Sequence, residues 1–261
     1  MFSKKEIKTL SNELVSLLKK IDYVDLFCFH GSRAAGRAAK DSDLDYYILF
    51  RGNFKKRIPK LFDLIGKETS LDKKDYFLKN DFVDFYGTHF VLQGKKVSIH
   101  FLEANSFEKY LKSLFKNEKM FNKYQPFVKG WIVEAIPLYD PKNLFIKFKK
   151  YVKFDIKFQK EAINKKLNLI KLMLPYAEKE ARKNLYIFYH NLNCIINLII
   201  DILYLKNKSF QISYFKALKN DIKKFKPNIE KELLYLIEKP NKEKYLKNKI
   251  SIIKRIVKKL K

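Results

Sequence analysis

The chain has 261 residues, of which 47% are hydrophobic and 15% aromatic, so it is too apolar for a disordered chain and long enough for one or two domains. Its two cysteines, Cys28 and Cys194, are too few for a disulfide framework or a zinc knuckle. The opening residues, MFSKKEIKTL, contain no apolar core of a secretory signal, and we therefore expect a cytoplasmic protein.

The formal net charge of +28 raises the question of a nucleic-acid partner, because clustered cations release counterions from phosphate backbones. Only six of the 56 cations are arginine, and the chain is also rich in Asn, Ile, Phe and Tyr, which indicates a general compositional bias. We favour that bias as the cause of the charge. Nucleic acid remains the alternative partner.

The charge is distributed unevenly along the chain. Residues 1–141 carry 25 basic and 18 acidic side chains, whereas residues 142–261 carry 31 and 10. The change coincides with Asp140-Pro141, a typical turn pair. We therefore predict two domains, 1–141 and 142–261.

Helix and strand signals are mixed in the first predicted domain. A helix is expected over residues 3–21, because Ser3 and Glu6 form a capping-box pattern and the apolar residues follow one helical stripe. Apolar strands are expected at 24–30 and 43–50, a helix between Phe54 and Phe77, and two strands within 88–104 around a Gln93-Gly94 turn. This order predicts an α/β domain with a small mixed β-sheet and flanking helices.

The second predicted domain shows only helical periodicity. Helices are expected at about 145–178, 182–206, 212–225, 228–238 and 242–260, with Pro227 and Pro240 at two of the breaks. The pattern is that of an all-α helical bundle.

Residues 186–205 are apolar over almost the length of a membrane span, yet they include His190, Asn193, Asn197 and Asp201. Unpaired polar groups are costly in hydrocarbon, so we expect no membrane partner. The four polar residues share one helical face. We expect them to form a hydrogen-bonded seam within the bundle, and the alternative is a surface that binds an acceptor substrate.

Two acidic residues, Asp43 and Asp45, stand at the start of the second apolar strand. Alternation along a strand projects both carboxylates to one face, about 6 to 7 Å apart along the backbone. Like charges at this spacing repel unless a cation lies between them. We therefore predict an Mg²⁺ site, because Mg²⁺ binds one or two carboxylates and completes its shell with water and phosphate oxygens.

Gly31-Ser32, at the end of the first strand, is a candidate phosphate site. Glycine permits a close backbone approach, and the following amides with the Ser32 hydroxyl can bind an anion. Four of the six arginines lie between residues 33 and 57, among them Arg33 and Arg37, and guanidinium groups bind phosphate in a bidentate manner. The alternative for the arginines is a solvated turn. Ser42 belongs to the same predicted nucleotide-binding set.

The order of apolar strand, Gly-Ser, ten residues, Asp-x-Asp and apolar strand resembles the signature of the DNA polymerase β-like nucleotidyltransferase superfamily. GSRAAGRAAKDSDLD is similar to its bacterial aminoglycoside- and lincosamide-type branch, and more weakly so are IPLYDP at 136–141 and LYLKNKSF at 203–210. The resemblance implies that Gly31 and Ser32 bind nucleotide phosphates and that Asp43 and Asp45 hold catalytic Mg²⁺.

The family usually has a third carboxylate on a later strand, and here Ser98 occupies the expected place. His100 lies two residues further, on the same strand face, and a neutral imidazole can accept a proton from an acceptor hydroxyl. We therefore add His100 to the candidate catalytic residues. Glu103 and Asp84 are alternative acids.

These residues predict an Mg²⁺-dependent nucleotidyltransferase that moves a nucleoside monophosphate from a nucleoside triphosphate, ATP in our expectation, to a hydroxyl of a small, antibiotic-type acceptor. One alternative is an antitoxin-like enzyme that modifies a partner protein. Another is an RNA-tailing enzyme that uses the basic helical half. A further alternative is slow turnover, because the third acid is replaced by Ser98. The sequence carries no signal of an oligomeric state.

Overall fold

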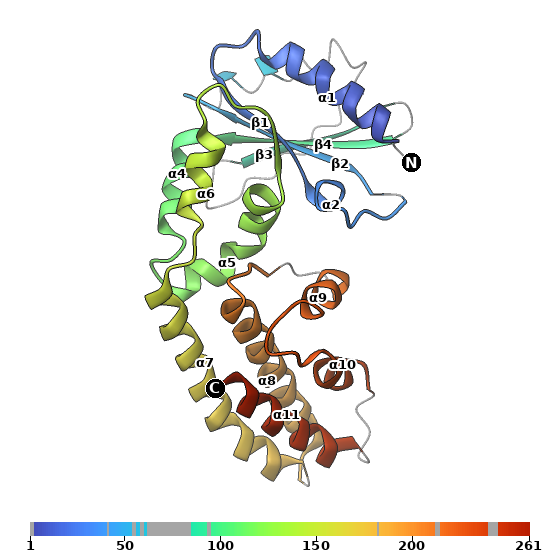
Figure 1. Cartoon of the computed structure of the whole chain (residues 1–261), viewed down its shortest axis with the longest axis vertical. Helices are drawn as coiled ribbons and strands as arrows, with labels where there is room; N and C mark the ends of the chain where they lie inside the picture. The colour runs from blue at the N-terminus through green and yellow to red at the C-terminus, as the bar shows by residue number, and fades with distance from the viewer. Residues whose placement is uncertain are drawn as a thin grey trace. The chain divides into compact units, whose positions relative to one another are not determined.

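The computed structural model describes residues 3–40, 42–53, 56–57, 60–61, 85–92, 95–181, 183–211, 215–239 and 245–261. The chain divides into two compact units, Met1–Lys153 and Phe154–Lys261. Figure 1 shows the elements of both units along the chain.

The first unit contains a β-sheet and the helices around it. Its elements are α1 Lys4–Leu18, β1 Val24–His30, α2 Gly31–Ala34, β2 Leu44–Phe50, β3 Phe85–Leu92, β4 Lys95–Glu103, α4 Ala104–Ser113, α5 Glu118–Val128, the π-helical turn η1 Lys129–Val133, β5 Ile136–Tyr139 and α6 Leu144–Tyr151.

The sheet has five strands in the order β3-β4-β2-β1-β5. β2 and β4 are parallel, and the other three neighbouring pairs are antiparallel. The predicted mixed sheet is therefore confirmed, including the two strands expected within 88–104. The Gln93-Gly94 turn and most of the helix expected between Phe54 and Phe77 lie outside the described residues.

Helix α1 begins as its sequence predicts. The Ser3 hydroxyl accepts a hydrogen bond from the Glu6 backbone N–H (3.2 Å), and the Glu6 carboxylate accepts one from the Ser3 backbone N–H (2.6 Å). These two bonds form the capping box and satisfy backbone donors that have no partner inside the helix.

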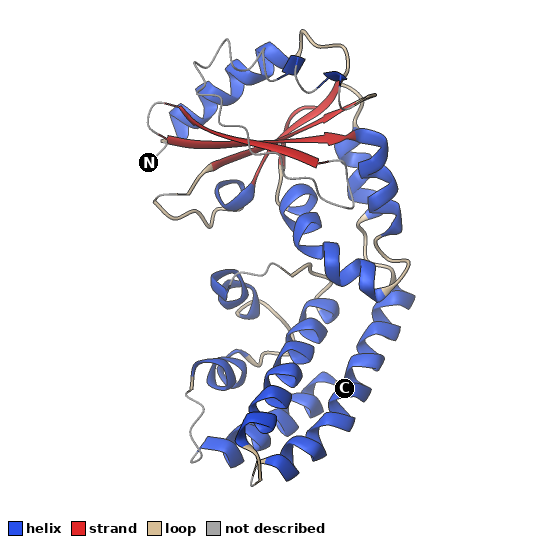
Figure 2. Cartoon of the chain, turned by 180° about the vertical axis from the view of Figure 1, so that it is seen from behind, coloured by secondary structure: helices blue, strands red, loops and turns tan. Residues whose placement is uncertain are grey.

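One face of the sheet is apolar and lies under α1. Leucines of α1 pack against alternate residues of the central strands, so both surfaces lose contact with water. Figure 2 shows helices on both sides of the sheet. The cluster includes Leu10, Leu14, Leu17, Leu18, Phe27, Phe29, Tyr46, Ile48, Phe50, Val97, Ile99 and Phe101.

The opposite face is partly covered by α4 and η1. Phe107 of α4 lies 6.0 Å from the Trp131 ring of η1, and the Tyr47 hydroxyl of β2 donates a hydrogen bond to the Trp131 carbonyl (2.7 Å). Sequence reasoning did not predict α4, α5 or η1, which follow β4 directly. The His30 and His100 rings, on the same sheet face, lie beside Trp131.

The second unit is entirely helical among the residues that the structure describes. Its helices are α7 Ile156–Glu180, α8 Leu185–Lys206, α9 Phe215–Ile222, α10 Glu230–Glu238 and α11 Leu246–Leu260. α8 packs against α7, α10 and α11, and its apolar side chains supply a large part of the core. The predicted bundle is confirmed for these elements.

One predicted helix, residues 145–178, is wrong as a single element. The structure has two helices there, α6 and α7, and α6 packs against α4, η1 and β1 of the first unit. The break has a local cause, because the Asp155 side chain accepts a hydrogen bond from the Phe158 N–H (2.7 Å) and caps α7. The helical periodicity of the apolar residues continues across Asp155, so it did not indicate the break.

Helix α8 explains the apolar segment noted in the sequence. Among the described residues it is the one helix that is long and apolar enough to cross a membrane, by length and composition alone. Its apolar residues belong to the core of the bundle, whereas His190, Asn193 and Asn197 are exposed. Asp201 forms an ion pair with Lys166 of α7 (2.8 Å), so at this position the polar stripe does form an inter-helix contact.

Candidate active site on the polar sheet face

Four polar residues of four neighbouring strands stand in one row across the sheet. The register pairs His30 of β1 with Asp45 of β2, Asp45 with Ser98 of β4, and Ser98 with His89 of β3. Paired residues of adjacent strands project to the same face. We call these four residues the polar row.

The row contains one hydrogen bond, at its β3 end. The Ser98 hydroxyl and His89 Nδ1 are 2.6 Å apart, and Ser98 is the register partner of Asp45. Ser98 is 1% exposed, whereas His89 is exposed. The row thus runs from a partly buried carboxylate, through a buried hydroxyl, to an imidazole at the surface.

The charged form of the Asp45 carboxyl is disfavoured in this site. Its pKa is raised to about 6, first because burial disfavours the carboxylate and then because of the negative charge of Asp43, while Arg33 opposes the shift. Asp43 directly precedes β2, so the strand begins one residue later than the sequence predicted. Within the described part of the chain, no ion pair involves either carboxylate.

Gly31 lies directly against Asp45. Its φ of +77° is one that side-chain-bearing residues rarely adopt, and a Cβ placed there would lie 2.1 Å from Asp45 Oδ2. No other residue type fits without displacing the carboxylate. The structure therefore brings the Gly-Ser corner and the acidic pair together, and Ser32, partly exposed in α2, follows at once.

Arg33 and Arg37 have protein partners in this structure. The Arg33 guanidinium donates to the Ser42 carbonyl (2.9 and 2.6 Å) and to the Asp43 carbonyl (3.1 Å), so it holds the loop before β2. Arg37 forms a bidentate ion pair with Glu134 (2.6 and 2.5 Å). The sequence did not indicate these positioning contacts, and the predicted phosphate contacts of both arginines stay predictions.

Ser42 supports the same loop. Its hydroxyl accepts a hydrogen bond from the Ala39 backbone N–H (2.8 Å), and its carbonyl is the acceptor for Arg33. This turn fixes the backbone immediately before Asp43. Its predicted contact with nucleotide stays a prediction.

His100 shares the strand face of Ser98 and contacts a second histidine. His100 Nδ1 lies 3.1 Å from His30 Nε2, and both rings lie near Trp131. Burial, with the neighbouring His89, lowers the pKa of His100 to about 4, and burial with His100 lowers the pKa of His30 well below its usual value. Both imidazoles are therefore neutral near pH 7. The role of His100 as base stays a prediction.

The two alternative acids have different positions. Glu103 accepts hydrogen bonds from the backbone N–H groups of Asn105 (3.1 Å) and Ser106 (2.7 Å), so it caps α4. Glu103 is also five residues from Ser98 on the same strand, and this odd spacing places the two residues on opposite faces of the sheet. Asp84 lies outside the described residues.

The donor set of the site fits magnesium. In the described ranges, no group of three or more His, Cys, Asp and Glu side chains is arranged to hold a metal ion. Mg²⁺ does not need such a group, because it is commonly bound through one or two carboxylates with water and substrate phosphates. Asp43 and Asp45 are hard oxygen donors, and a cation between them would relieve the repulsion that raises the pKa of Asp45.

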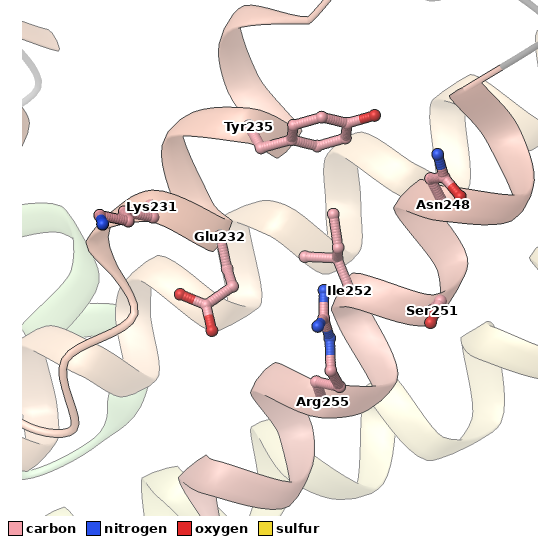
Figure 3. Close-up of a pocket in the computed structure, with 7 residues that line it drawn as sticks. All are labelled: Lys231, Glu232, Tyr235, Asn248, Ser251, Ile252 and Arg255. Atoms are coloured by element: carbon pink, nitrogen blue, oxygen red, sulfur yellow. The ribbon is translucent and has the colours of Figure 1, made fainter.

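The second unit has a pocket of about 430 Å³ between α10 and α11 (Figure 3). Lys231, Glu232 and Tyr235 line it from α10, and Asn248, Ser251, Ile252 and Arg255 from α11. Glu232 forms an ion pair with Lys259 (2.5 Å), which lowers the pKa of its carboxyl. Among the described residues, its lining includes one carboxylate and no histidine, so the polar row is the stronger candidate for chemistry.

The chain was compared with protein families, curated proteins and solved structures. No protein-family model matches the chain, and no curated protein matches it. A solved structure is similar over most of the chain. It is a nucleotidyltransferase-like protein from Exiguobacterium sibiricum 255-15, with a TM-score of 0.49 and 11% sequence identity, and the match covers 97% of this chain and 74% of that chain. A match at this level does not identify a family.

Proposed function

We propose that the chain is an Mg²⁺-dependent nucleotidyltransferase that transfers a nucleoside monophosphate from a nucleoside triphosphate, ATP in our expectation, to a hydroxyl of a small-molecule acceptor. The observation that carries this proposal is the contact of Gly31 with Asp45, beside Asp43, at the end of β1. A phosphate approaching the Gly31-Ser32 backbone meets the acidic pair at this corner.

The residues of this corner have separate roles in the proposed reaction. Asp43 and Asp45 would hold Mg²⁺, which neutralises charge on the triphosphate when bound. Gly31 and Ser32 bind and orient the phosphates, and Arg33 keeps the loop before β2 in place through the Ser42 and Asp43 carbonyls. Residues 1–141 form the catalytic domain in this proposal, and residues 142–261 form an accessory domain that binds the acceptor.

The bonds change at the α-phosphorus. The acceptor oxygen attacks it in line, a new O–P bond forms, and the bond from the α-phosphorus to the oxygen bridging to the β-phosphate breaks. Pyrophosphate leaves, and the proton of the acceptor hydroxyl passes to a base on the protein. Placement of the two substrates and neutralisation of their charge supply most of the acceleration.

Pyrophosphate release tests the proposal. The wild-type protein is incubated with each of the four nucleoside triphosphates, Mg²⁺ and a panel of hydroxyl compounds. We expect release that requires Mg²⁺ and an acceptor, and a loss of about a thousandfold in Asp45→Asn, because removal of a group that stabilises transition-state charge has effects of that size.

Glu13→Gln is the control variant, since Glu13 is exposed on α1. It should keep the wild-type rate. A rate in Asp45→Asn equal to that of the control would contradict the proposal. If the enzyme modified a co-purified protein or RNA and none of the small hydroxyl compounds, the proposed acceptor class would be wrong.

A further inference from the structure

His89 is the surface end of the polar row and was not singled out by the sequence. It lies on β3, the edge strand of the sheet, and it is exposed. Its Nδ1 is 2.6 Å from the Ser98 hydroxyl, and Ser98 is the cross-strand neighbour of Asp45. An exposed imidazole is thereby hydrogen-bonded to a buried hydroxyl that is the register neighbour of Asp45.

Ser98 stands between Asp45 and His89 in the register of the sheet. An ionised carboxylate only accepts hydrogen bonds, so the Ser98 hydroxyl has an acceptor as its neighbour on one strand and His89 Nδ1 on the other. The Ser98 oxygen can then accept a hydrogen bond from His89 Nδ1–H. A neutral histidine with the proton on Nδ1 has a lone pair on Nε2, so this arrangement presents a proton acceptor at the surface.

We propose that His89, oriented by Ser98, is the general base of the reaction and takes the place of the third carboxylate. This inference rests on the proposed function and assigns the base that the reaction needs. His89 Nε2 takes the proton of the acceptor hydroxyl while the acceptor oxygen bonds to the α-phosphorus and pyrophosphate leaves. The imidazolium then returns the proton to solvent.

The position of His100 is less suited to this role. His100 contacts His30 through Nδ1 and lies beside Trp131, within the covered part of the sheet face. His89 is the exposed member of the three histidines on this face. An acceptor hydroxyl arriving from solvent therefore meets His89 first.

The tautomer of His89 is the first test, and it needs neither Mg²⁺ nor substrate. Imidazole ¹⁵N NMR at about pH 8, where histidine is ordinarily neutral, reports which nitrogen carries the proton. We expect the Nδ1–H form in the wild-type protein and a shift toward Nε2–H in Ser98→Ala. A wild-type His89 in the Nε2–H form would overturn the proposal.

The second test is kinetic. In His89→Gln we expect kcat to fall about a hundredfold to ten-thousandfold, the usual contribution of a general base, with little change in the affinity for Mg²⁺-nucleotide. Ser98→Ala should cause a smaller loss, and Ser98→Thr, which keeps the hydroxyl, should recover part of it. Glu13→Gln, at an exposed position of α1, serves as the control.

The outcomes separate the two proposals. If the wild-type protein transfers nucleotide and His89→Gln transfers at the same rate, the base assignment is wrong and the nucleotidyltransferase function stands. A loss of kcat in His100→Gln without a loss in His89→Gln would also overturn the assignment of His89 as the base. If the wild-type protein releases no pyrophosphate with any acceptor, the proposed function itself fails, and the base assignment fails with it.

Discussion

The two faces of the sheet are built from the same strands, and only one of them carries the polar row. On the face under α1, alternate residues of β1, β2 and β4 are apolar and fully buried. On the other face, the register brings the polar row together. Strand alternation thus allows one short sequence, such as β2, to contribute to the core and to a site at the same time.

From this difference we infer which substitutions should affect folding and which should affect chemistry. The face under α1 buries apolar area, and changes there should act on the free energy of unfolding. The polar face holds carboxylates and imidazoles in positions that disfavour their charged forms, and changes there should act on binding, rate and pH dependence. Each prediction below applies to one face.

The largest expected effect is that of Gly31→Ala on the polar face. The new Cβ would lie 2.1 Å from Asp45 Oδ2, so the carboxylate must move away from the corner. We expect a loss of about a thousandfold in kcat/KM, or about 4 kcal/mol, measured as pyrophosphate release.

Gly36→Ala is the matched control. Gly36 also has a positive φ, of 68°, but within the described part of the chain a Cβ added there would meet no atom within 4 Å beyond its chain neighbours. Its substitution should therefore cost about 1 kcal/mol of folding stability from backbone strain and leave kcat/KM unchanged. Equal effects of the two substitutions on kcat/KM would show that the Gly31–Asp45 contact has no functional role.

The next effect belongs to the apolar face. Ile48 is 0% exposed in the cluster under α1, and Ile48→Ala should lower the free energy of unfolding by about 3 kcal/mol. Ile146→Ala, at a position 58% exposed on α6, should change it by no more than about 0.5 kcal/mol. Urea denaturation measures both. The molecules that remain folded should keep their affinity for Mg²⁺-nucleotide, and a specific loss of binding in Ile48→Ala would contradict the division between the faces.

The smallest effect is a dependence of stability on pH. The folded state lowers the pKa of His100 from 6.5 to about 4, so between these values the unfolded chain binds more protons than the folded one. The contribution of His100 to stability should therefore fall by at most about 3 kcal/mol as the pH decreases from 6.5 to about 4. His30, whose pKa is also lowered, adds in the same direction. Asp45, whose pKa is raised to about 6, contributes in the opposite direction below pH 6.

Urea denaturation at several pH values checks this dependence. His100→Gln removes the destabilising protonation of His100, so as the pH decreases across that window its stability should fall less, or rise more, than that of the wild-type protein. His190→Gln should retain the wild-type slope, because His190 lies in the other unit and is exposed. A slope in His100→Gln as steep as in the wild-type protein would contradict the assignment of neutral histidines to this face.

Much of the fold followed from local signals. The capping box of Ser3 and Glu6 and the apolar runs of β1 and β2 predicted α1 and two central strands. The break between α6 and α7 was missed, because helical periodicity continues through Asp155 and only its hydrogen bond to Phe158 shows the cap. Local pattern predicts element type better than element boundaries.

The candidate site was predictable only in part. Gly31, Asp43 and Asp45 are close in sequence, so strand geometry and a familiar spacing indicated them. The contact of His89 with Ser98 depends on the register of β3 and β4. The position of Ser98 beside Asp45 depends on the parallel pairing of β2 and β4. Alternation along residues 88–92 could have placed His89 on the polar face, but no local pattern specifies which strands become neighbours.

The most direct test of the account is calorimetric titration of ATP into the wild-type protein and into the Asp43→Asn, Asp45→Asn double variant, each with Mg²⁺ and with EDTA. The account predicts that Mg²⁺ strengthens binding to the wild-type protein by at least about tenfold and has no such effect on the double variant. Equal affinities of the two proteins in Mg²⁺, or a wild-type affinity that does not change in EDTA, would contradict it.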